Sequence, residues 1–187
     1  AHGMFLRNSN GQDIIVAKDR VTFRAIGGIL DWYIFVGPTH EQVIQQYHGL
    51  IGKPHFTPYW SLGWHQCKYG WKNLDEVKTV VSTYAQHKIP LDTVWADIDY
   101  MDQYEDFSFD PVNYPPDQVA AFVKELHSNG QHYVVIVDPG IHNRSGYKSY
   151  EQGLQADIFI KNGDGKTPFI GRVWPGYTAF PDFLNPN

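Results

Sequence analysis

Six carboxylates follow one short apolar run in the stretch VWADIDYMDQYEDFSFDP, residues 94 to 111. Aromatic and turn residues separate these acids, and the stretch ends at a proline. Such a cluster could bind a metal ion through its oxygens, hold the hydroxyl groups of a sugar, or form a solvated turn. The acids are Asp97, Asp99, Asp102, Glu105, Asp106 and Asp110.

Two carboxylates in the chain come just after apolar runs that we expect to be strands. Asp97 follows TVWA, and Asp138 follows VVIV. Ligands of parallel α/β folds bind beyond the carboxyl ends of the strands, so both acids are expected on the functional face. A helix cap or a loop salt bridge explains Asp97 equally well on pattern alone. For Asp99 we favour a structural role, and we expect the later acids of the stretch to be solvated or paired with lysine and arginine.

The sequence gives little support to a metal or a nucleotide cofactor. DIDYMDQYED lacks the spacing and the central glycine of a calcium-binding EF-hand loop. The histidines His65, His127 and His132 lack the helical spacing of zinc hydrolases. No Walker loop or glycine fingerprint follows an expected strand. We therefore expect neither a metal site nor a cofactor in this chain.

Aromatic residues accompany the expected strand ends. Tyr69 and Trp71 follow the first strand, Trp95 lies at the end of the second, and Trp174 follows a later hairpin. A sugar ring has apolar C–H faces and a polar rim, so flat aromatic faces beside carboxylates are typical of sugar sites. Core packing explains any single tryptophan equally well. Their shared position at strand ends is what favours a site.

Composition narrows the classes of partner. The net charge of −5 comes from 20 acidic and 15 basic residues without long runs of either sign, which does not favour nucleic acid or an anionic membrane. No apolar run is as long as a membrane span, and the first residues lack a signal-peptide pattern. The single cysteine, Cys67, excludes a disulfide within these 187 residues.

The pattern of elements changes near residue 39. Residues 1 to 37 alternate short apolar runs with turn residues, which is typical of the hairpins of a β-sandwich. Thr39 and Gln42 have capping-box spacing and open an apolar helical face that ends at Gly52. We therefore assign residues 1–51 to the end of an amino-terminal β-sandwich and a linker helix.

Residues 52–187 alternate strands and helices. The expected strands are YWSLGW, LDTVWADI and HYVVIVDPGI, and the helices between them begin at caps Asn73 and Asp117, the second ending at Gly130. A hairpin turned at Asn162 to Gly165 is expected next, followed by an aromatic loop, PGYTAFPDF. This order predicts a parallel α/β fold. Three parallel strands complete neither a barrel nor an open sheet, so we expect the chain to be a piece of a larger protein.

Five strings resemble the eukaryotic α-glucosidases of glycoside hydrolase family 31: GGILDWYIFVGPT, PYWSLGWHQCKYGW, WADIDYMDQYEDFSFDPVNYP, HYVVIVDPGI and RVWPGYTAFPDF. They run through nearly the whole chain in the order of that family. The resemblance implies a β-sandwich followed by a (β/α)8 TIM barrel. Residues 52–187 would then be the first three βα units of the barrel, with the start of an inserted region.

The resemblance also implies roles for individual residues. Asp97 matches the aspartate that binds hydroxyls of the terminal glucose, and Asp138 matches a residue that orients its neighbours without touching sugar. The tail of the acidic stretch, with Asp106 and Asp110, matches structural positions. The remaining matches are pocket-wall positions: Trp95, Ile98, Tyr69, Ile141 and Trp174.

The pair of carboxyl groups that breaks the bond in retaining glycosidases has no match in this sequence. The family's nucleophile lies in a W-x-D-M-N-E-like motif on the fourth strand, and its acid/base lies later; neither motif occurs here. We therefore expect no catalytic residue in this chain, and no activity without the remaining polypeptide that carries the catalytic carboxylates.

The expected function is removal of terminal α-linked glucose from maltose, maltooligosaccharides or starch, with retention of configuration. The alternatives are an α-xylosidase or an α-glucan lyase on the same fold, or a carbohydrate-binding homologue without catalysis. Asn143-Arg144-Ser145 is an acceptor sequence for N-glycosylation. Together with the resemblance it favours a secreted protein over a lysosomal or other lumenal one.

Overall fold

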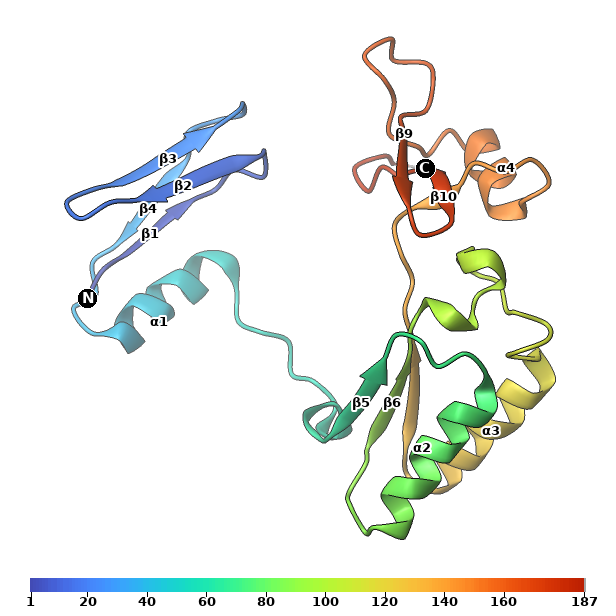
Figure 1. Ribbon diagram of the computed structural model, residues 1–187. Coiled ribbons are helices and arrows are strands. Elements are labelled where there is room, and N and C mark those ends of the chain that lie inside the picture. The colour runs from blue at the N-terminus through green and yellow to red at the C-terminus, as the bar shows by residue number, and fades with distance from the viewer. Residues whose placement is uncertain (187) are drawn as a thin grey trace. The chain divides into compact units, whose positions relative to one another are not determined.

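The computed structural model describes residues 1–186 and contains two compact units, residues 1–56 and residues 57–187. Both are drawn in Figure 1, and each is described by itself below. None of the helices within residues 1–186 is long and apolar enough to cross a membrane.

The first unit consists of two antiparallel strand pairs and one helix. Strand β1 (Gly3–Leu6) pairs with β4 (Trp32–Phe35), and β2 (Gln12–Val16) pairs with β3 (Val21–Ala25). The β pattern predicted for residues 1 to 37 is therefore confirmed. Edge-to-face contacts join Phe5 and Phe35 of the β1–β4 pair to Tyr47 of helix α1 (His40–Ile51).

Helix α1 begins and ends where the sequence predicts. The Gln42 N–H donates to the Thr39 hydroxyl at 3.3 Å, and the Gln42 side chain accepts the Thr39 N–H at 3.0 Å. This reciprocal capping box satisfies two amide groups that the first turn leaves without helical partners. Gly52 ends the helix with a φ of 91°.

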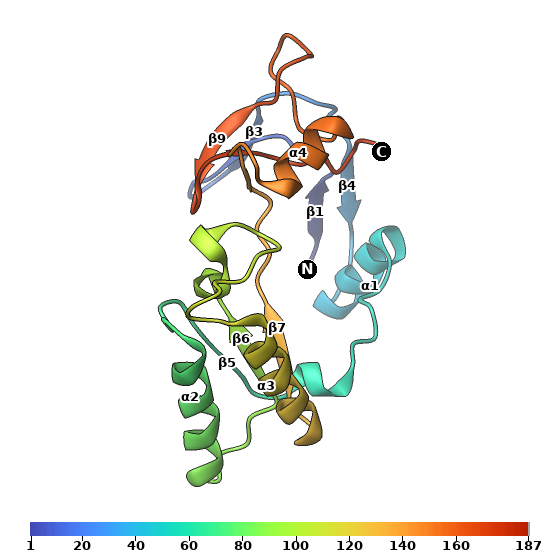
Figure 2. The same cartoon turned by 90° about the vertical axis from the view of Figure 1, so that its right-hand side faces the viewer.

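The second unit contains a parallel sheet with the strand order β5-β6-β7. Its strands are β5 (His65–Lys68), β6 (Thr93–Ala96) and β7 (His132–Val135), with Cys67 opposite Trp95 and Trp95 opposite Val134. Helix α2 (Leu74–Gln86) connects the first pair of strands and α3 (Pro116–Ser128) the second. The parallel α/β prediction is confirmed, and both helices lie against one face of the sheet (Figures 1 and 2).

The core of this unit lies between the helices and the sheet. Val94 and Ala96 of β6 pack there with Val77 of α2 and Phe122 of α3, all nearly inaccessible to water. Side chains alternate along a strand, so Thr93 and Trp95 lie on the opposite face of β6. The strand therefore turns Val94 and Ala96 to the helices, while on the other face Thr93 is buried and Trp95 is 40% exposed.

Three sequence predictions about element positions are wrong. The apolar run YWSLGW is not the first strand: Tyr59–Leu62 forms a 3-10 turn after Pro58, and β5 begins at His65. Asp117 does not cap α3, because Pro116 occupies the first helical position and Pro115 the cap. PGYTAFPDF is not a loop throughout, since its residues Gly176–Ala179 form strand β10.

The remainder of the unit is a small antiparallel sheet with one helix. Its order is β8-β10-β9, formed by Ile141–His142, Gly176–Ala179 and Ile170–Val173, and helix α4 spans Lys148–Gln155. Its core contains Ile141, Tyr147, Phe159 and Ala179. The predicted turn at Asn162 to Gly165 is present, and the Asn162 N–H donates to the Thr167 carbonyl at 2.8 Å.

Candidate functional site

A cavity of about 420 Å³ lies beyond the carboxyl ends of the parallel strands. Two carboxylates, two aromatic rings and two isoleucines surround it, so it has both polar and apolar walls. The lining residues are Tyr69, Asp97, Ile98, Ile136, Asp138 and Trp174.

Each wall of the cavity comes from a different connection. Tyr69 is the residue after β5, and Asp97 is the residue after β6. Ile136 and Asp138 follow β7, and Trp174 lies in the tight turn between β9 and β10. Neighbouring parallel strands end at the same edge of the sheet, which is why Tyr69, Asp97 and Asp138 meet here although they are far apart in sequence.

Asp97 combines a cap with a place in the cavity wall. It precedes the 3-10 turn Ile98–Tyr100, and its Oδ1 accepts the Ile98 N–H at 2.8 Å. The Ile98 side chain is 5% exposed and packs into the core below. The two interpretations left open by the sequence are therefore compatible, because the cap fixes the carboxylate at the cavity.

The main chain next to Tyr69 is held by Asp99, the acid for which the sequence favours a structural role. Gly70 has a φ of 96°, a conformation that glycine adopts at little cost, and its N–H donates to Asp99 Oδ2 at 2.8 Å. A side-chain hydrogen bond with Tyr69 raises the pKa of Tyr104. The structure thus confirms a structural part for Asp99 and gives Tyr69 a support on each side.

Asp138 is half-buried, and its environment disfavours the charged form. Burial raises the pKa of this carboxyl, and the negative charge of Asp97 raises it further. Its backbone N–H donates to Asp106 Oδ1 at 2.9 Å. The cavity therefore contains two carboxylates whose charges interact, with one of them anchored through its own main chain.

Two residues predicted for the pocket wall do not line this cavity. The Trp95 indole N–H donates to His65 Nδ1 at 2.8 Å on the open face of the sheet, where the side chain is 40% exposed. Ile141 is buried in the core beside α4. Ile136 lines the cavity instead and was missed; its two-residue spacing from Asp138 in an extended segment is the signal that could have identified it. The sugar-binding roles themselves remain predictions.

The tail of the acidic stretch is more buried than its polar sequence indicates. Glu105 and Asp106 are each 2% exposed. Glu105 pairs with Arg144, as acids of this stretch were expected to pair, whereas Asp106 accepts a backbone amide. Asp110 accepts the N–H groups of Val112 and Asn113 at 2.8 and 2.9 Å, which is a local turn.

The chemistry of this set is that of polyol recognition. Carboxylates accept hydrogen bonds from neighbouring hydroxyl groups, and the exposed faces of Tyr69 and Trp174 can pack on C–H groups. Within residues 1–186, no group of three or more His, Cys, Asp or Glu side chains is arranged to hold a metal ion.

Residues 54–187 match the TIM-barrel domain of the glycosyl hydrolases, family 31. The chain therefore belongs to glycosyl hydrolase family 31. It is similar over 99% of its length to the DNJ-bound alpha subunit of glucosidase II, with a TM-score of 0.87, 30% identity and 21% of that chain covered.

The curated relatives are similar over the whole chain. A probable alpha-glucosidase of Oryza sativa subsp. japonica is 52% identical over 99% of this chain and 21% of its own length. An alpha-glucosidase of Mucor javanicus is 48% identical over 100% of this chain and 22% of its own length. Alpha-xylosidase 1 of Arabidopsis thaliana is 47% identical over 100% of this chain and 20% of its own length. The chain thus spans about a fifth of the length of these relatives.

Proposed function

We propose that this chain is part of a retaining, exo-acting α-glucosidase that removes terminal α-linked glucose from maltose, maltooligosaccharides or starch. The observation that carries the proposal is the convergence of Asp97, Asp138, Tyr69 and Trp174 on one cavity at the strand ends. The proposed reaction is inferred from the relatives that are named alpha-glucosidase.

In this proposal the cavity holds the terminal glucose. The Asp97 carboxylate accepts hydrogen bonds from the sugar hydroxyl groups, and Trp174 and Tyr69 pack against the apolar faces of the ring. Asp138 orients its neighbours.

The catalytic carboxylates belong to polypeptide outside this sequence. A retaining glycosidase needs a nucleophile and an acid/base roughly 5–5.5 Å apart, and the family's nucleophile motif does not occur here. Residues 1–51 are then the end of a β-sandwich with a linker helix, and residues 52–187 the first three units of the barrel with the start of an insertion. The strand order β5-β6-β7 and its helical crossovers support the second assignment.

Product analysis of the complete enzyme tests the reaction. Proton NMR during maltose hydrolysis is expected to show α-glucose as the first product, because double displacement retains configuration. First formation of β-glucose would contradict retention, an unsaturated sugar would indicate a lyase, and a strong preference for α-xylosides would favour the xylosidase. Residues 1–187 alone are expected to hydrolyse none of these substrates.

We further propose that the protein is secreted and carries a glycan on Asn143. Asn143 is half-buried at the start of the connection from β8 to α4. Enzymatic removal of N-glycans is expected to increase the electrophoretic mobility of the protein. In the Asn143→Gln variant the part of this increase that is due to the glycan on Asn143 is expected to be absent. An unchanged mobility in both experiments would contradict glycosylation at this position.

A further inference from the structure

Two adjacent carboxylates outside the cavity lining, Glu105 and Asp106, are almost inaccessible to water. Each is 2% exposed, and both lie in the connection between β6 and α3. A buried carboxylate costs stability unless it makes strong interactions, so two in succession need an explanation. Their partners all come from the segment that follows β7.

Asp106 contacts that segment at two points. Its Oδ1 accepts the Asp138 backbone N–H at 2.9 Å, and its main-chain carbonyl accepts the Tyr147 hydroxyl at 2.5 Å. The first bond lies at a residue that lines the cavity, and the second lies just before α4. Asp106 therefore fixes two places in the segment that follows β7, one before β8 and one just before α4.

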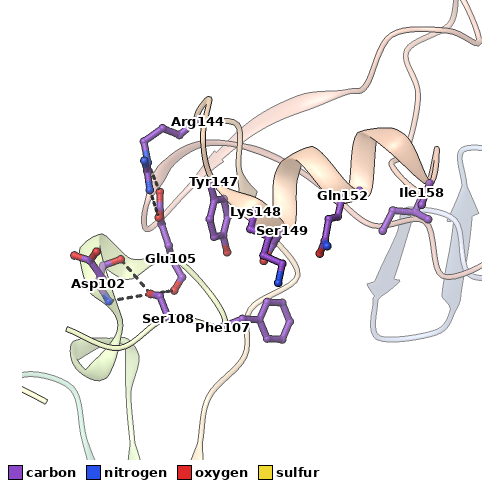
Figure 3. A pocket seen from close by; sticks show the side chains of 12 residues that line it. Asp102, Glu105, Phe107, Ser108, Arg144, Tyr147, Lys148, Ser149, Gln152 and Ile158 are labelled. Carbon is purple, nitrogen blue, oxygen red and sulfur yellow. Dashed lines mark hydrogen bonds and ion pairs between the residues drawn. The ribbon is translucent and has the colours of Figure 1, made fainter. Parts of the chain in front are cut away.

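Glu105 contacts the same segment through ionic hydrogen bonds. Arg144 donates from Nε and Nη2 to its two oxygens at 2.7 and 2.6 Å (Figure 3). His142 Nδ1 lies 2.7 Å from Glu105 Oε1. A bidentate guanidinium pair fixes direction as well as distance. The hydrogen bonds from Arg144 lower the pKa of Glu105 against the opposing effect of burial.

This contact continues to Trp174. His142 of β8 pairs with Thr178 of β10, and β10 pairs with β9 across the turn that carries Trp174. Glu105 is therefore connected through one small sheet to the aromatic wall of the cavity.

The backbone around the two carboxylates is strained. Gln103, Tyr104 and Phe107 have φ values of 52°, 61° and 60°, a region that non-glycine residues adopt at a cost. Such conformations persist where surrounding contacts over-determine them. The contacts of Glu105, Asp106 and Ser108, whose hydroxyl donates to the Glu105 carbonyl at 2.5 Å, are of that kind.

We propose that Glu105 and Asp106 form an inter-loop clamp with His142, Arg144 and Tyr147, and that this clamp positions Asp138 and Trp174 against Asp97. Asp106 is a positioning residue, because it acts through the Asp138 main chain. This inference rests on the proposed function, since its readout is hydrolysis of an α-glucoside.

The test uses Asp106 variants of the complete enzyme. Asp106→Ala removes the acceptor of the Asp138 N–H, and misplaced binding groups lower catalysis by roughly 10- to 100-fold. We expect a loss in kcat/KM for maltose within that range and a weaker inhibition by glucose, measured well below the melting temperature. Asp106→Asn keeps Oδ1 and is expected to recover activity to within about threefold of wild type.

A matched variant controls for disturbance of the connection. Asp102→Ala removes a half-exposed carboxylate from the same stretch, where the Asp102 main chain bonds to Ser108, and is expected to retain wild-type kinetics. Wild-type kcat/KM in Asp106→Ala would overturn the inference. Equal losses in the Ala and Asn variants would also overturn it, because the acceptor would then not be the cause.

Tyr147→Phe decides the question where Asp106→Ala does not fold. It removes only the hydroxyl that bonds to the Asp106 carbonyl, and a loss of about threefold or more in kcat/KM is expected. Unchanged kinetics in this variant would contradict the clamp. A wild-type enzyme inactive on every α-glucoside would instead refute the proposed function, which separates the two failures.

Discussion

The carboxylates of Asp97 and Asp138 line one cavity, where burial and the negative charge of Asp97 both raise the pKa of Asp138. The two residues follow neighbouring parallel strands, so the sheet itself sets their proximity. Asp97 also accepts the Ile98 N–H, whereas Asp138 is held by its main chain. We expect Asp97, whose carboxylate caps the 3-10 turn, to be the residue that binds sugar.

Substitution of Asp97 is expected to weaken catalysis strongly. Asp97→Ala removes the charged acceptor of the proposed hydrogen bonds from the sugar hydroxyl groups. Each such bond is worth about 1.5–3 kcal/mol, so kcat/KM for maltose should fall roughly 100-fold or more. Asp97→Asn keeps an oxygen for the Ile98 N–H and should show how much of the loss is due to charge. Steady-state kinetics of both variants, compared with Asp102→Ala, provide the measurement. Unchanged kinetics in Asp97→Ala would refute its role at the cavity.

Loss of the Asp99 carboxylate is expected to affect Tyr69 indirectly. Asp99→Ala leaves the Gly70 N–H without its acceptor, at a cost of about 1 kcal/mol, and should raise KM roughly three- to tenfold with a smaller change in kcat. Asp99→Asn retains an acceptor oxygen and serves as the matched control. If the Ala variant has the wild-type KM, the Gly70 contact does not position Tyr69.

The indole of Trp174 is expected to contribute affinity through its exposed face. It is 65% exposed at the cavity, and removal of an aromatic platform is worth about 1–2 kcal/mol, so Trp174→Ala should raise KM about 5- to 30-fold. Tyr177 is the control, because it lies on the same hairpin, is 63% exposed and does not line the cavity. Similar effects of Tyr177→Ala and Trp174→Ala on KM would argue against a sugar platform.

Local signals in the sequence predicted the helices better than the ends of the strands. The caps at Thr39 and Asn73 depend on residues three positions away, so they can be identified from spacing. The short aromatic run YWSLGW has no periodicity that separates a strand from a 3-10 turn, so the sequence alone predicts the first parallel strand at the wrong residues. The parallel order β5-β6-β7 could be predicted from the alternation of strands and helices alone.

The arrangement of the site was predictable only in part. Asp97 directly follows β6, as predicted, whereas Asp138 lies three residues beyond β7, because the apolar run HYVVIVDPGI forms a strand only over His132–Val135. The burial of Glu105 was not predictable, since its partner Arg144 lies 39 residues away and the intervening strand sets their distance. Alternation along the segment after β7 identifies Ile136, because it lies two residues before Asp138.

Asp106 is expected to make stability depend on pH near neutrality. Burial raises its pKa from 3.8 to about 6, partly offset by the Asp138 amide, while the charge of Asp138 raises it further. The charged and phenolic groups that face it are Asp138, Tyr100 and Tyr147. The folded protein thus binds this proton more tightly than the unfolded chain does. The stability that Asp106 contributes is therefore fully present below about pH 4 and is lost as the pH rises through about 6.

Asp106→Asn removes this dependence because the amide does not ionise and can still accept the Asp138 N–H. A shift of about two units corresponds to at most about 3 kcal/mol, so the melting temperature of the variant relative to wild type should rise between pH 4 and pH 7. Calorimetric scans of both proteins across that range give the comparison, and Asp102→Asn provides the control for a more exposed carboxylate. A constant difference in melting temperature would show that the Asp106 carboxyl does not titrate in this range.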